Sequence, residues 1–111
     1  MFRAAVIQMV STPDVGENLA AAGELLRRAA GAGADFALLP EYFPIISDDD
    51  RAKLGHREPF GTGPIQDFLR EQAVRHRLWL MGGTLPLDCG EEDRVYNSCI
   101  LYSPDGEAAA R

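Results

Sequence analysis

Phe36-Ala37-Leu38-Leu39-Pro40-Glu41-Tyr42-Phe43 is the stretch that decides the fold of this chain. Its first four residues are apolar without alternation, which predicts a strand covered on both faces. Pro40 ends that strand, because proline cannot donate to a strand ladder. Glu41 therefore follows the carboxyl end of a buried strand, where open α/β sheets bind their ligands.

Glu41 is for this reason the strongest functional candidate. We expect it to lie largely out of solvent, with its carboxylate pointing into a cleft. Tyr42 and Phe43 are candidate substrate-binding residues that wall this cleft, although both could instead belong to the core. A carboxylate shielded from water holds a proton more tightly, which suits a general base. The alternative interpretation is a solvated loop glutamate.

Strands and helices alternate on both sides of this stretch. Strands are expected over residues 2–9, 36–39, 78–81 and 95–102, with Trp79 in the core. A helix is expected from Asp14, where a capping box begins, to about residue 31, and a second helix from Pro64. This order predicts an α/β fold with a parallel or mixed sheet.

The remaining segments are predicted loops and turns. Residues 41–60 form a long loop with one helical turn, and residues 85–94 form a second loop. Ser103-Pro104-Asp105-Gly106 is a turn that announces a hairpin. Only five residues follow it, three of them alanine, and they are a poor partner for the strand before. The chain is therefore expected to be cut off in mid-element.

Composition narrows the class of protein. A chain of 111 residues with 46% hydrophobic and 25% charged residues fits one soluble globular domain. A net charge of −6 disfavours nucleic acid and anionic membranes as partners. No apolar stretch is long enough to span a membrane. Two cysteines are too few for a disulfide scaffold, so we expect free thiols and a cytoplasmic location.

No cofactor or metal is expected from the sequence. His56 and His76 lack ligand spacing with either cysteine, and His76 is interpreted as a partner of a helix dipole. The acidic run 48–50 lacks the glycine and distal glutamate of a calcium loop. The turn after the first strand has no glycine cluster for a pyrophosphate, which disfavours a nucleotide-binding domain.

An ordered set of motifs resembles the nitrilase superfamily of carbon–nitrogen hydrolases. The segment 38–43 resembles the superfamily's glutamate segment. The matching motifs around it are Ala4 to Met9, Asn18-Leu19, Gly63-Pro64-Ile65, Leu80 to Thr84 with Pro86, Tyr96-Asn97-Ser98 and Ser103 to Gly106. The runs 58–69 and 82–84 most resemble amidases that act on deaminated glutathione and related ω-amides.

The resemblance implies a fold and a mechanism. The fold would be a four-layer α-β-β-α sandwich, of which residues 1–111 are the amino-terminal part of a single domain. The activity would be hydrolysis of a small amide or nitrile by a Glu-Lys-Cys triad, with Glu41 as the glutamate. The complete protein would be a homo-oligomer, as members of this superfamily usually are.

Two members of the triad have no match in this chain. Lys53 is the only lysine and lies in the loop after Glu41. Cys99 is predicted inside a strand and Cys89 in an acidic loop, so both are interpreted as structural or incidental. We therefore expect the chain alone to be inactive. The alternative is a non-catalytic truncated remnant or an association module of the same fold.

Overall fold

The computed structural model describes residues 1–111. Its elements, in chain order, are β1 (Ala4–Val6), α1 (Val15–Gly31), β2 (Phe36–Leu38), the 3-10 turn η1 (Ala52–His56), α2 (Pro64–His76), β3 (Trp79–Met81), β4 (Leu85–Asp88), β5 (Val95–Ser98), β6 (Leu101–Tyr102) and β7 (Ala108–Ala110). The expected alternation of strands and helices is confirmed, including the single helical turn in the long loop after Glu41.

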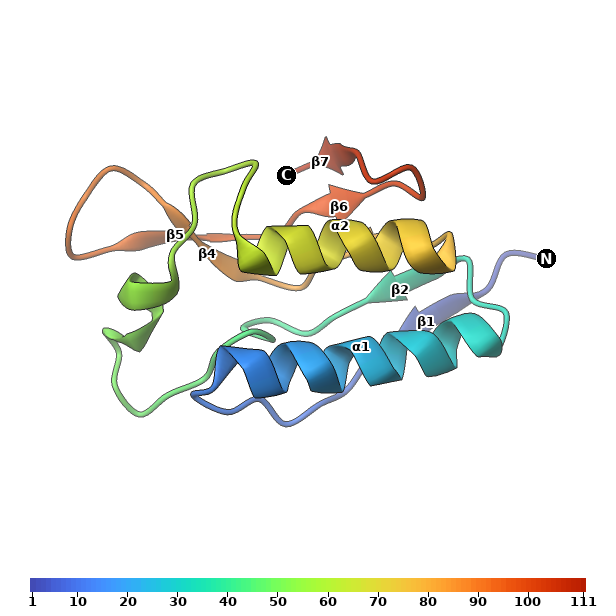
Figure 1. Cartoon of the computed structure of the whole chain (residues 1–111), viewed down its shortest axis with the longest axis horizontal. Helices are drawn as coiled ribbons and strands as arrows, with labels where there is room; N and C mark the ends of the chain where they lie inside the picture. The colour runs from blue at the N-terminus through green and yellow to red at the C-terminus, as the bar shows by residue number, and fades with distance from the viewer.

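Two sheets carry these strands. The larger has the order β1-β2-β3-β6-β7, in which the first three strands run parallel and the last two are added antiparallel. The smaller is the antiparallel pair β4-β5. Figure 1 shows α1 and α2 side by side over one face of the larger sheet, with the β4–β5 pair extending beyond its end. The predicted α/β class is thus confirmed.

Local sequence accounts for the ends of both helices. The Asp14 side chain accepts a hydrogen bond from the Glu17 N–H at 3.0 Å, which satisfies one of the free amides at the start of α1. Pro64 occupies the first turn of α2, where its missing N–H costs nothing. Arg77 ends α2 in the left-handed conformation, with φ of 53°.

The core lies between the larger sheet and the two helices. The strand register places Ala37, Leu80 and Tyr102 in one row across β2, β3 and β6, and all three are at most 1% exposed. The small side chains Ala22 and Ala73 are also fully buried, which lets both helices approach the sheet closely.

The opposite face of the larger sheet is open and apolar. Because side chains alternate along a strand, Val6 and Trp79 point away from the helices, and they are 77% and 40% exposed. The prediction that Trp79 belongs to the core is therefore wrong. The strand register sets Trp79 beside Phe36, on the face of the sheet opposite the helices.

Three boundary predictions also need correction. The single strand expected over residues 95–102 is two strands in different sheets, since β5 pairs with β4 and β6 pairs with β3. The loop expected over 85–94 begins with β4. The residues after the Ser103 turn do form a strand, β7, because backbone pairing with β6 does not depend on the alanine side chains.

Candidate functional site

Glu41 follows the carboxyl end of β2, as predicted, but it is exposed to solvent. It sits in a tight turn in which the Phe43 N–H donates to the Pro40 carbonyl at 3.2 Å. The expectation that Glu41 lies largely out of solvent is therefore wrong for this chain. The physical reason is its place in a turn beyond the end of β2, outside the core that the sheet and the helices form.

The two aromatic residues after Glu41 have different environments. Tyr42 has a positive φ of 56°, which is uncommon for a residue with a large side chain. Its N–H donates to the Thr84 hydroxyl at 2.8 Å, which holds this conformation. Tyr42 lines both described pockets, whereas Phe43 is 0% exposed and belongs to the core. The expectation of Phe43 as a wall residue is therefore corrected.

Gly83 lets a second segment approach the turn at Glu41. A Cβ atom on Gly83 would overlap the Pro40 carbonyl, and its φ of +62° also favours glycine. The Gly82-Gly83-Thr84 segment after β3 is thus packed directly against the residue before Glu41 and bonded to the residue after it.

Two polar side chains from the α1 side hold the same turn. The Ser11 hydroxyl donates to the Phe43 carbonyl at 2.7 Å. The buried Asn18 amide donates to the Pro44 carbonyl at 2.9 Å and to the Thr12 carbonyl at 2.6 Å. Neither residue is a candidate site residue from the sequence, where Asn18 enters only through the Asn18-Leu19 motif. One feature of the sequence does point to Asn18: its polar amide lies in the first turn of the predicted helix, on the helix face that otherwise carries apolar residues.

Asn97 provides the one side-chain hydrogen bond to Glu41. Its Nδ2 donates to Glu41 Oε2 at 3.2 Å, across 56 positions of sequence. Asn97 belongs to β5, so the small sheet contacts the candidate residue of the large one. This contact cannot be read from the sequence, because the order of the strands does not determine how far a hairpin folds back over the sheet.

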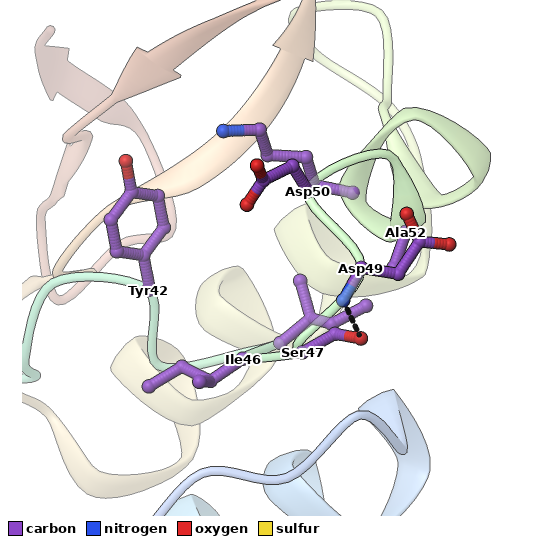
Figure 2. Close-up of a pocket in the computed structure, with 8 residues that line it drawn as sticks. Tyr42, Ile46, Ser47, Asp49, Asp50 and Ala52 are labelled. Carbon is purple, nitrogen blue, oxygen red and sulfur yellow. Dashed lines mark hydrogen bonds between the residues drawn. The ribbon is translucent and has the colours of Figure 1, made fainter.

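Two pockets lie beside Tyr42. The larger, of about 210 Å³, is lined by Tyr42, Ile45, Ile46, Ser47, Asp49, Asp50, Ala52 and Lys53. Figure 2 shows the Tyr42 ring on one side of it and the 46–52 loop curving around the other. The smaller, of about 40 Å³, is lined by Tyr42, Pro44, Ile45, Lys53, Pro86, Val95 and Asn97. The Lys53 ammonium stands 5.6 Å from the centre of the Tyr42 ring, a cation–π distance.

The cysteines do not form part of this site. Cys99 lies between β5 and β6 rather than inside a strand, and partial burial raises the pKa of its thiol. A raised pKa keeps the thiol protonated, which disfavours a nucleophile. The Cys89 thiol donates to the Arg94 carbonyl at 3.3 Å within the acidic loop. Both cysteines are free.

No group of three or more His, Cys, Asp or Glu side chains is arranged to hold a metal ion. No helix is both long and apolar enough to cross a membrane.

The fold of this chain is that of a known protein family. Residues 3–111 match the model of the carbon-nitrogen hydrolase family, and the chain belongs to that family. Among solved structures, it resembles a branch 10 member of the nitrilase superfamily from Saccharomyces cerevisiae, with a TM-score of 0.85 and 25% identity. That similarity covers 98% of this chain and 42% of the yeast chain.

The curated relatives are amidases. The chain is 33% identical to the deaminated glutathione amidase of Synechocystis sp. over 99% of its own length and 40% of the relative's. It is 32% identical to the omega-amidase of Danio rerio over 95% of its length and 36% of the relative's. The predicted resemblance is thus confirmed, and the chain spans only 36–40% of the length of these two relatives.

Proposed function

We propose that this chain supplies the catalytic glutamate of an enzyme that hydrolyses a small amide. The observation that carries the proposal is the placement of Glu41: it follows the carboxyl end of an internal parallel strand, in a turn held from both sides, and it pairs with no arginine or lysine. The family match and the amidase relatives support it.

The proposed chemistry is acyl transfer through a thioester. Glu41 takes the proton of a cysteine thiol, the thiolate attacks the amide carbon, and a lysine stabilises the resulting oxyanion. Collapse of the tetrahedral intermediate breaks the C–N bond, and the leaving amine takes the proton. Glu41 then activates water, which releases the acid. Lys53, Cys89 and Cys99 match neither of the other two members of the triad, so we propose that these come from outside residues 1–111.

The exposed Glu41 carboxylate must be shielded from water if it is to act as a general base. A general base needs a site that excludes bulk water, and this chain alone leaves the carboxylate exposed. We propose that further protein covers it, together with the Tyr42 pockets, in a complete enzyme. That enzyme would be a cytoplasmic homo-oligomer acting on a small-molecule amide, in keeping with the free thiols of Cys89 and Cys99.

The second candidate is a non-catalytic remnant or association module. The observation that favours it is the open apolar face of the larger sheet, which includes Val6 and Trp79. An exposed face of this kind is typical of a surface that associates.

The test is Glu41→Gln in protein expressed from the complete reading frame. Glutamine keeps the shape of the side chain and its acceptor for Asn97 but cannot take up a proton. We expect ammonia release from succinamic acid to fall by at least about 100-fold, with the thermal unfolding temperature unchanged. Near-normal turnover by this variant would exclude Glu41 as the base. A wild-type protein that hydrolyses no amide would favour the non-catalytic alternative.

A further inference from the structure

The contact between Asn97 and Glu41 connects the two sheets, whose strands do not pair with each other. Glu41 follows β2 of the larger sheet, and Asn97 lies in β5 of the smaller one. The Asn97 Nδ2–Glu41 Oε2 bond of 3.2 Å is the only side-chain hydrogen bond of Glu41, and Glu41 takes part in none of the salt bridges.

We propose that Asn97 is a positioning residue for Glu41; this inference rests on the proposed function of Glu41 as a general base. A neutral amide suits the task, because it fixes one carboxylate oxygen and leaves the other free to accept a proton. An arginine or lysine at the same place would stabilise the ionised carboxylate strongly and so weaken it as a base.

Asn97 lies in a paired strand, β5, rather than in a loop. Asn97 lies opposite Pro86 in the β4–β5 ladder. Val95 lies two residues before it, on the same side of β5, and both line the smaller pocket with Tyr42. The side of β5 that carries Asn97 therefore faces the Glu41 turn and not the opposite surface.

The outer edge of β4 is fixed to the rest of the molecule through Glu58. The Glu58 N–H donates to the Pro86 carbonyl at 3.2 Å, and the Asp88 N–H donates to the Glu58 carbonyl at 2.9 Å. Strand β4 is thus hydrogen-bonded along both of its edges, to β5 on one side and to Glu58 on the other. This bonding restrains the strand pair that carries the Asn97 side chain.

The Glu58 side chain in turn anchors this edge to α2. It is only 5% exposed, and its carboxylate accepts the Ile65 N–H at 2.7 Å and the Gln66 N–H at 3.1 Å. A helix N-terminus stabilises a carboxylate placed in this way. A continuous series of bonds therefore runs from α2 through β4 and β5 to Glu41.

Kinetics of the protein from the complete reading frame test the role. We expect Asn97→Ala to lower kcat on succinamic acid by about 10- to 100-fold with KM within about twofold of wild type, because a misplaced base slows chemistry more than binding. Asn97→Gln, which restores an amide, should recover part of that loss. Ser98→Ala is the matched control: it lies on the other side of the same strand and should leave kcat unchanged. A folded Asn97→Ala variant with wild-type kcat would overturn the inference.

A second measurement tests the contact without any need for activity. In protein labelled with ¹⁵N-asparagine, Glu41→Ala should move the Asn97 side-chain amide resonances upfield, since their charged acceptor is lost. The Asn18 amide, which bonds to the Thr12 and Pro44 carbonyls, should not move and serves as the internal reference. Unmoved Asn97 resonances would overturn the inference. Moved resonances in a protein that hydrolyses no amide would support the contact and refute the proposed function instead.

Discussion

The Cys99 side chain shows how burial lowers the reactivity of a thiol. Partial burial raises the pKa of this thiol, so little thiolate is present near neutral pH. We expect iodoacetamide at pH 8 to modify Cys89 first and Cys99 more slowly, as mapped by peptide mass spectrometry. Urea-unfolded chain is the control, in which both should react alike. Faster modification of Cys99 in the folded protein would contradict its assignment as a structural residue.

His76 gives a second prediction at this scale. Burial first, and then the charges of Arg75 and Arg27, lower the pKa of its imidazole, so the folded state disfavours the protonated form. Because its pKa is lowered, His76 is not supported as a charged partner of the helix dipole. The pKa of His76 in the unfolded chain is about 6.5. Below that pH the unfolded chain binds a proton that the folded chain binds less readily. The stability contribution is thus complete above pH 6.5 and is lost as the pH falls through the lowered folded pKa.

The check is the pH dependence of the free energy of unfolding in wild type and His76→Gln. Wild type should lose more stability than the variant as the pH falls below about 6.5, and the two curves should run parallel above it. His56→Gln is the control, because His56 lies exposed in η1. Parallel curves throughout would show that His76 does not resist protonation in the folded state.

Substitution of Gly83 would test whether the segment after β3 stabilises the Glu41 turn. Gly83→Ala would place a Cβ atom on the Pro40 carbonyl and force a non-glycine residue into positive φ. We expect a loss of about 1–3 kcal/mol in the free energy of unfolding, measured in urea. Gly31→Ala is the control, since nothing lies within 4 Å of its added Cβ, and this change in α1 should be neutral or slightly stabilising.

The elements differ in how far the sequence could predict them. The strand before Glu41 and both helices were predictable, because an apolar run and the caps at Asp14 and Pro64 are local signals. The division of residues 95–102 between two sheets was not, since it depends on pairing with strands elsewhere in the chain. The same limit applies to the site: Glu41 was predictable from its strand, while its contact with Asn97 required the tertiary fold.

At the scale of the whole molecule, the open sheet face should govern behaviour in solution. Val6 and Trp79 expose apolar side chains on a face that no helix covers. We expect the isolated 111-residue chain to self-associate and to show no amidase activity, as judged by light scattering and ammonia release.

Matched lysine substitutions locate the responsible surface. Val6→Lys should shift the chain toward monomer, because a charge on β1 opposes burial of the open face. Val10→Lys should not, since Val10 lies outside the sheet although it is even more exposed, at 89% against 77% for Val6. A monomeric wild-type chain with a cooperative unfolding transition would show that the open face does not drive association.

The bonds of Glu58 also bear on hydrogen exchange. One residue holds the first amides of α2 through its carboxylate and the Asp88 amide through its carbonyl. Separation of the Glu58 segment from its neighbours would break all three of these hydrogen bonds at once. The protection of Ile65, Gln66 and Asp88 should therefore rise and fall together, although Asp88 lies in a different element from the other two. Local opening at this point would release the small sheet as one cooperative unit while the three parallel strands stayed paired.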